Sequence, residues 1–109
     1  MDEPLRIGRV DFINTFPLAW ALDRHLPAGL AREIAAVPTA LNRMLESGEI
    51  DVANVSSIAY ARNADEWVLL PSVCIGSAGA VESVHLVTDA PLPAVRSVAA
   101  TAKSASSVA

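Results

Sequence analysis

The apolar side chains of residues 5–63 switch repeatedly between two spacings, and this switch constrains the fold more than any other feature. Residues 5–10 alternate between apolar and polar side chains, which is typical of a strand. The short runs 32–37 and 49–55 also favour strands, whereas apolar side chains three or four residues apart favour helices between the runs. We therefore predict three strands, each followed by a helix.

Signals at the helix boundaries support this alternation. Thr15 can cap the first helix, and the second begins at Pro38 and ends before Gly48. A short third helix follows the possible caps Ser56 and Ser57. A repeat of strand, loop and helix implies right-handed crossovers, so the predicted fold class is α/β, with a mostly parallel sheet flanked by helices.

After residue 63 the pattern changes to short apolar runs separated by Pro and Gly. We expect further strands at 67–70, 73–75, 84–87 and 98–100. The residues after 100 contain several helix-cap candidates and then the first apolar positions of a helix. We therefore expect the sequence to be a fragment of a longer protein.

Charge and hydropathy exclude two classes of partner. The formal net charge is -4 and the eight basic residues are scattered, which disfavours binding to a phosphate backbone. No signal-peptide pattern precedes residue 5, and no apolar run approaches the ~20 residues of a membrane span. The expectation is a soluble, cytoplasmic protein with neither a nucleic-acid nor a membrane partner.

Signatures of metal and cofactor sites are also missing from the sequence. His25 and His85 lie far apart without ligand spacing around them. The glycines at 76 and 79 lack the Lys-Ser/Thr that follows a phosphate-binding loop. Cys74 has apolar neighbours and is predicted to be a buried small side chain. We expect no metal and no cofactor.

The candidate ligand site lies at the carboxyl ends of the predicted strands, where open α/β sheets bind their ligands. Three loops reach this position, 11–15, 54–57 and 103–107, and all are rich in Asn, Ser and Thr. Hydroxyl and amide groups beside helix N-termini suit a carboxylate or another small anion. The alternative for each single Ser or Thr is a simple helix cap. Three such loops together favour an acidic metabolite as the ligand.

With these loops identified, the sequence resembles the chorismate dehydratases of menaquinone biosynthesis from end to end. The resemblance includes an Asn-Thr-x-Pro-Leu turn, a Gly-x-x-Asp segment, paired serines and a serine-rich helix start. The sequence departs from the family pattern at Asp11-Phe12, where Ser-Tyr is more usual, and at Ser106, where Thr is expected. The matching blocks, in order, are 6–10 with 14–18, 48–53 with 55–57, 74–77 with 79–84, and 104–108.

The resemblance implies a fold and an activity. The fold is a periplasmic-binding-protein-like fold of type II, with two α/β lobes that close over chorismate. Residues 1–109 would form the N-terminal lobe, and the second lobe would lie outside this sequence. The reaction is the dehydration of chorismate to 3-[(1-carboxyvinyl)oxy]benzoate in the futalosine pathway, driven by aromatisation. The 109 residues alone are expected to be inactive.

The resemblance also implies roles for individual residues. The substrate's own enolpyruvyl carboxylate would take the ring proton, which agrees with the lack of His and Glu in the three loops. Asn14 would be the catalytic residue that orients the substrate or stabilises the developing charge. The residues expected to hold the substrate are Ser56, Ser57, Ser83, Ser104, Ser106 and Ser107.

Three other functions fit the same α/β fold. A solute-binding protein for a small carboxylate would share the anion-holding loops but would normally carry a secretion signal. The related dihydroxynaphthoate synthase opens with a Cys-Pro-Asn-Asp-Thr type of turn, where residues 12–16 here are Phe-Ile-Asn-Thr-Phe. A transcription-factor effector domain would follow a DNA-binding element, and none precedes residue 5.

Overall fold

The chain forms a small parallel sheet in the computed structural model, which describes residues 3–82 and 84–103. The strands are β1 (Leu5–Arg9), β2 (Ala31–Ala35) and β3 (Val52–Ala53), in the order β2-β1-β3. Both neighbours pair with β1 in parallel. Consecutive parallel strands need crossovers, and the helices supply them. The α/β class and the parallel sheet are therefore confirmed.

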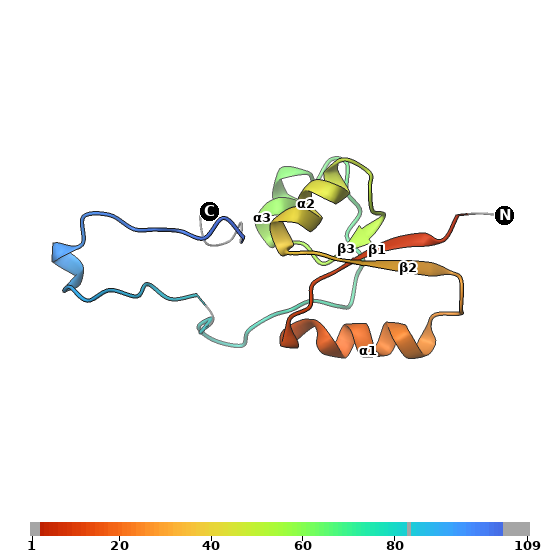
Figure 1. Cartoon of the computed structure of the whole chain (residues 1–109), viewed down its shortest axis with the longest axis horizontal. Helices are drawn as coiled ribbons and strands as arrows, with labels where there is room; N and C mark the ends of the chain where they lie inside the picture. The colour runs from red at the N-terminus through yellow and green to blue at the C-terminus, as the bar shows by residue number, and fades with distance from the viewer. Residues whose placement is uncertain (1–2, 83, 104–109) are drawn as a thin grey trace.

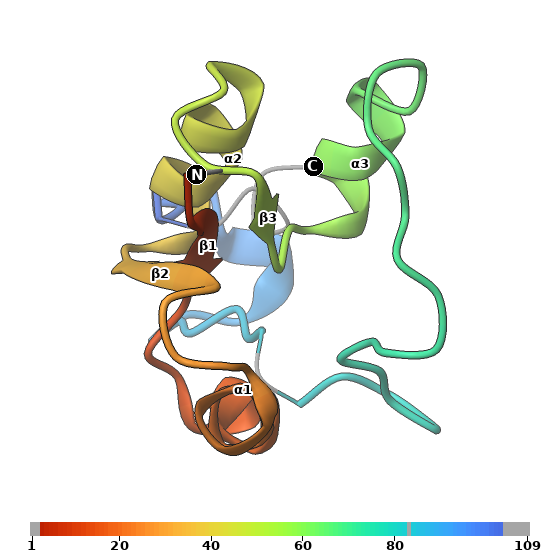
Figure 2. The ribbon, with the colours of Figure 1, turned by 90° about the vertical axis from the view of Figure 1, so that its right-hand side faces the viewer.

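Helices cover both faces of this sheet. Helix α1 (Phe16–His25) lies on one side, and α2 (Pro38–Glu46) and α3 (Ser57–Arg62) lie on the other (Figures 1 and 2). A short 3-10 turn, η1 (Ile13–Thr15), leads into α1, and a second one, η2 (Leu92–Ala94), lies far along the chain. None of the helices in the described part of the chain is long and apolar enough to cross a membrane.

The hydrophobic core lies between the sheet and α2. Leu41 and Ile50 are fully buried there and pack with Val10. Gly8 of β1 allows this close approach, because a Cβ at this position would lie 2.6 Å from Ile50 Cδ1 and 2.8 Å from Leu41 Cδ2. The partly buried residues around the cluster are Ile34, Ala36, Met44, Leu45 and Ala53.

Three of the predicted helix boundary signals are confirmed, among them the start of α2 at Pro38, and one is wrong. Gly48 follows α2 with a φ of +74, and Ser56 caps α3 by accepting a hydrogen bond from the Ala59 backbone N–H at 3.2 Å. Thr15 precedes α1, but its side chain makes no capping bond. Its backbone is helical (φ -94, ψ -8) because it ends η1, whereas a capping residue needs an extended backbone. The Thr15 hydroxyl faces the preceding loop instead.

The strands predicted after residue 63 are not formed. In the described part of 64–103 the regular structure is confined to η2, and 67–70, 73–75, 84–87 and 98–100 have none (Figure 1). A strand needs a paired neighbour for its backbone groups, and these runs pair with nothing in the described chain. Cys74 lies in this segment and is exposed, so the prediction that it is buried is also wrong.

The apolar side chains of this segment are exposed as a consequence. Their hydrophobic pattern is present, but no second layer of the described chain covers them. The large ones with more than half of their surface exposed are Val68, Leu69, Leu70, Val73, Ile75, Val81, Val84, Leu86, Val87, Leu92 and Val98.

Candidate functional site

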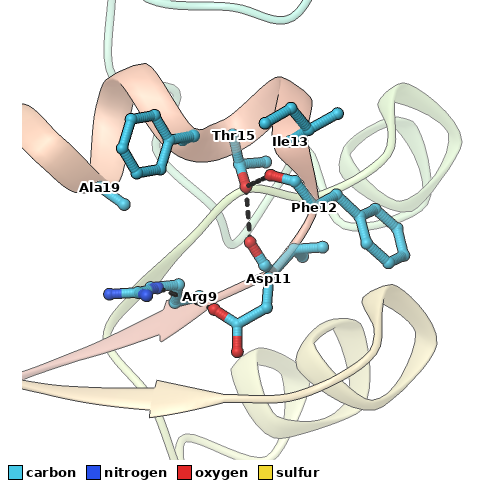
Figure 3. A pocket seen from close by; sticks show the side chains of 8 residues that line it. Arg9, Asp11, Phe12, Ile13, Thr15 and Ala19 are labelled. Atoms are coloured by element: carbon cyan, nitrogen blue, oxygen red, sulfur yellow. Dashed lines mark hydrogen bonds and ion pairs between the residues drawn. The ribbon is translucent and has the colours of Figure 1, made fainter.

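A hollow of about 270 Å³ opens where β1 ends and α1 begins (Figure 3). It therefore lies at the carboxyl end of the central strand, the position at which open α/β sheets bind ligands. Its walls come from the end of β1, from η1 and from the first turn of α1. The lining residues are Arg9, Val10, Asp11, Phe12, Ile13, Thr15, Phe16 and Ala19.

The hollow is mainly apolar, with one cation and one anion at its edge. Arg9 donates from Nε to Asp11 Oδ1 at 2.9 Å, and from Nη1 to Glu33 Oε2 at 2.7 Å. The hydrogen bond to Glu33, followed by the one to Asp11, raises the pKa of the Arg9 guanidinium. Of the residues that line the hollow, Arg9 is the only one with a positive charge.

The pleat of the sheet explains why Arg9 reaches the hollow. Alternate side chains of a strand point to opposite faces. Gly8 faces α2, so Arg9 faces the side on which α1 lies. Glu33 pairs in register with Ile7, which lies on that same face two residues before Arg9. The ion pair therefore joins two neighbouring strands. This ion pair was not predicted from the sequence, in which the alternation within 5–10 is the one signal for it.

Thr15 shapes the turn that forms the wall of the hollow. Its side chain is buried, and its hydroxyl lies 2.5 Å from the Val10 carbonyl oxygen and 2.8 Å from that of Phe12. The Thr15 backbone N–H also donates to the Phe12 carbonyl at 3.0 Å. These contacts hold the chain as it leaves β1 and turns into η1. The family-like Asn-Thr pair therefore includes a residue with a clear structural task.

Asn14 lies on the same turn, between Ile13 and Thr15, and is exposed. It is adjacent to the hollow in the chain but is not among the residues that line it. The structure thus places Asn14 at the carboxyl end of the central strand, as the sequence predicts. Its role in catalysis stays a prediction.

The second predicted loop follows β3, the strand next to β1. Because β1 and β3 are parallel, with Gly8 opposite Ala53, their carboxyl ends lie at the same edge of the sheet. Ser56 is half-buried and engaged as the cap of α3, whereas Ser57 is exposed. The remaining predicted binding residues, Ser83, Ser104, Ser106 and Ser107, lie outside the described residues.

A second hollow, of about 340 Å³, lies at the opposite end of the strands and includes Leu5, Arg6 and Asp51 in its lining. Arg6 binds the Asp51 carboxylate through both of its prongs, with Nε to Oδ2 at 3.0 Å and Nη2 to Oδ1 at 2.8 Å. The side-chain hydrogen bond from Arg6 is the main cause that lowers the pKa of Asp51 to about 2. The charges of Arg6 and Asp51 neutralise each other. We therefore assign the residues of this second hollow a structural role.

The side chains around the two hollows do not form a recognisable metal site in the described part of the chain. Within the described ranges, 3–82 and 84–103, no three His, Cys, Asp or Glu side chains gather in a way that could hold a metal ion. The carboxylates closest to the first hollow, Asp11 and Glu33, are both bonded to Arg9. The chemistry of the hollow is thus that of one guanidinium paired with the Asp11 carboxylate, backbone groups and apolar walls.

Comparison with known proteins identifies the family. The family model described as menaquinone biosynthesis matches residues 5–109. A protein of Thermus thermophilus named chorismate dehydratase is 44% identical over 106 residues, which are 97% of this chain and 38% of that protein. The chain therefore spans less than half the length of this relative. The family match includes all three candidate loops, 11–15, 54–57 and 103–107, and the chain belongs to the menaquinone biosynthesis family.

Proposed function

We propose that the protein to which these residues belong is a chorismate dehydratase, which converts chorismate to 3-[(1-carboxyvinyl)oxy]benzoate. The observation that carries the proposal is the apolar hollow at the carboxyl end of β1, which has one guanidinium in its lining and Asn14 on the turn that forms its wall. Its position and chemistry suit a small, ring-containing acid. The name of the Thermus thermophilus relative supports the same substrate.

In the proposed reaction the ring loses a proton beside the enolpyruvyl ether and then loses the neighbouring hydroxyl, so that one water leaves overall. The abstracted proton leaves with the hydroxyl as water, and the aromaticity gained in the second step makes the overall dehydration favourable. The only carboxylate that lines the hollow, Asp11, is bonded to Arg9. We assign the proton to the substrate's own enolpyruvyl carboxylate, which the enzyme holds within reach.

The residues of this chain would bind and orient the substrate. Asn14 would donate from its amide to a substrate oxygen on which charge develops. Ser57 has an exposed side chain beyond the carboxyl end of β3 and would bind the substrate there. Ser56, beside the first turn of α3, would also bind the substrate. The serines expected to hold carboxylates from the other loops are Ser83, Ser104, Ser106 and Ser107.

The proposal includes a two-lobed, periplasmic-binding-protein-like fold of type II, of which residues 1–109 form the N-terminal lobe. Three observations support this part. The chain matches 38% of the relative's length, and its segment 67–98 exposes many large apolar side chains. At about 270 Å³ the hollow is also slightly smaller than the roughly 300–1,000 Å³ of complete ligand sites. We therefore propose that the 109 residues alone are inactive.

Product analysis tests the proposed function. Full-length protein is incubated with chorismate, with and without a metal chelator, and the products are separated by chromatography. We expect the aromatic enolpyruvyl-benzoate in both samples, because the proposed steps require no metal. Chorismate that binds but stays unconverted would identify a solute-binding protein instead. Activity that is lost with chelator and restored by zinc or magnesium would contradict the proposed mechanism.

A further inference from the structure

We propose that Arg9 binds a carboxylate of the substrate, and that Asp11 occupies its guanidinium until the substrate displaces it. This inference rests on the proposed function, because it assigns the substrate's negative charge to one side chain of the same hollow. Arg9 is the only cation among the lining residues, and the neighbouring walls are largely apolar. The Arg9 side chain is about one-third exposed, so an incoming carboxylate can reach its guanidinium.

The two carboxylates on Arg9 differ in how firmly they are held. The Glu33 side chain is 28% exposed and comes from the neighbouring strand β2. The Asp11 side chain is 63% exposed and lies in the loop that follows β1. Ion pairs between exposed side chains contribute little to stability. An incoming carboxylate can therefore displace Asp11 readily, while Glu33 keeps the guanidinium in place.

The geometry of a guanidinium suits this exchange. Its planar fork carries more N–H donors than the two that bond Asp11 and Glu33, and it can pair with a carboxylate through two parallel bonds. A substrate carboxylate that takes the place of Asp11 would thus meet a group already oriented by Glu33.

Arg6 provides a matched control within the same strand. Like Arg9 it lies in β1, is about one-third exposed and is bonded to an aspartate. Its partner Asp51, however, lies at the other hollow, and Arg6 is absent from the lining of the first. A substitution of Arg6 therefore shows the effect of losing an arginine from β1. A substitution of Arg9 shows, in addition, the effect of losing the cation at the first hollow.

Steady-state kinetics of the full-length enzyme test the inference. For Arg9→Gln we expect KM for chorismate to rise about ten- to a hundredfold, with kcat changed about threefold at most, since a charge-assisted hydrogen bond is lost. Arg9→Lys keeps the charge but loses the fork, and should give an intermediate KM. Asp11→Asn removes the competitor and should lower KM about threefold. Arg6→Gln should leave KM unchanged.

Three results would overturn the inference while the proposed function stands: an unchanged KM in Arg9→Gln, an equal rise in Arg6→Gln, or a higher KM in Asp11→Asn. If wild-type enzyme converts no chorismate, the proposed function fails instead. Calorimetric binding of chorismate to wild type and Arg9→Gln then still tests Arg9, and equal affinities would contradict its role. Melting temperatures of all variants identify any that fail to fold, and Arg9→Lys then replaces Arg9→Gln.

Discussion

Arg6 and Asp51 are joined by three hydrogen bonds to one carboxylate, two from the guanidinium and one, at 2.8 Å, from the Arg6 backbone N–H. The Asp51 backbone N–H returns a bond to the Arg6 carbonyl, also at 2.8 Å. Asp51 directly precedes β3, so the pair aligns the start of β3 with the middle of β1. The aspartate of the Gly-x-x-Asp segment thus has a structural explanation.

The lowered pKa of Asp51 predicts how stability depends on pH. The folded pKa of about 2 lies below the unfolded value of about 3.9, so the stabilisation is complete above pH ~4 and is lost as the pH falls toward 2. Asp51→Asn should therefore be less stable than wild type at pH 6, and the difference should shrink between pH 4 and 2. Urea unfolding across this range measures it. A difference that is constant with pH would contradict the ion pair.

Gly8 predicts a strict limit on side-chain size in β1. Gly8→Ala would place a methyl group 2.6 Å from Ile50 Cδ1 and 2.8 Å from Leu41 Cδ2, so we expect a loss of about 1–3 kcal/mol in the free energy of unfolding. Gly79→Ala is the control, because nothing lies within 4 Å of its added Cβ. Equal stabilities of the two variants in urea would show that α2 does not pack this closely on β1.

The hydrogen bonds of the Thr15 hydroxyl in the turn after β1 should contribute to the stability of the fold. Thr15→Val keeps the shape of the side chain but leaves the Val10 carbonyl without its buried donor, which should cost about 1–3 kcal/mol. Thr15→Ser keeps the hydroxyl and should lose less. Thr88→Val, at an exposed position, should change the stability by under about 0.5 kcal/mol. Thermal unfolding compares the variants, and a Thr15→Val protein as stable as Thr88→Val would refute the structural task of this hydroxyl.

Most local features of the first 63 residues could be predicted from the sequence. The helix boundaries at Pro38, Gly48 and Ser56 follow from short-range backbone chemistry, and the parallel sheet follows from the alternation of elements. Strand lengths were less predictable. The run 49–55 forms only a two-residue strand, since only Val52 and Ala53 pair with β1.

Features that depend on contacts between residues far apart in the sequence could not be predicted. The apolar runs of 67–100 resemble strands, but a run becomes a strand only where another backbone pairs with it. The bond between Arg9 and Glu33 joins residues 24 positions apart in the sequence, which no local pattern reveals. The turn at Asn14 and Thr15 was located correctly, although the Thr15 hydroxyl braces the loop rather than capping α1.

Asn14 is exposed on the turn beside the hollow, and its proposed catalytic role can be tested directly. Asn14→Asp is nearly isosteric, but it replaces a donor with a carboxylate that faces an anionic substrate. We expect kcat for chorismate dehydration by the full-length enzyme to fall about a hundredfold or more, with an unchanged melting temperature. A variant with a lower melting temperature and near-normal turnover would make Asn14 a turn residue only, and the active site would have to lie elsewhere.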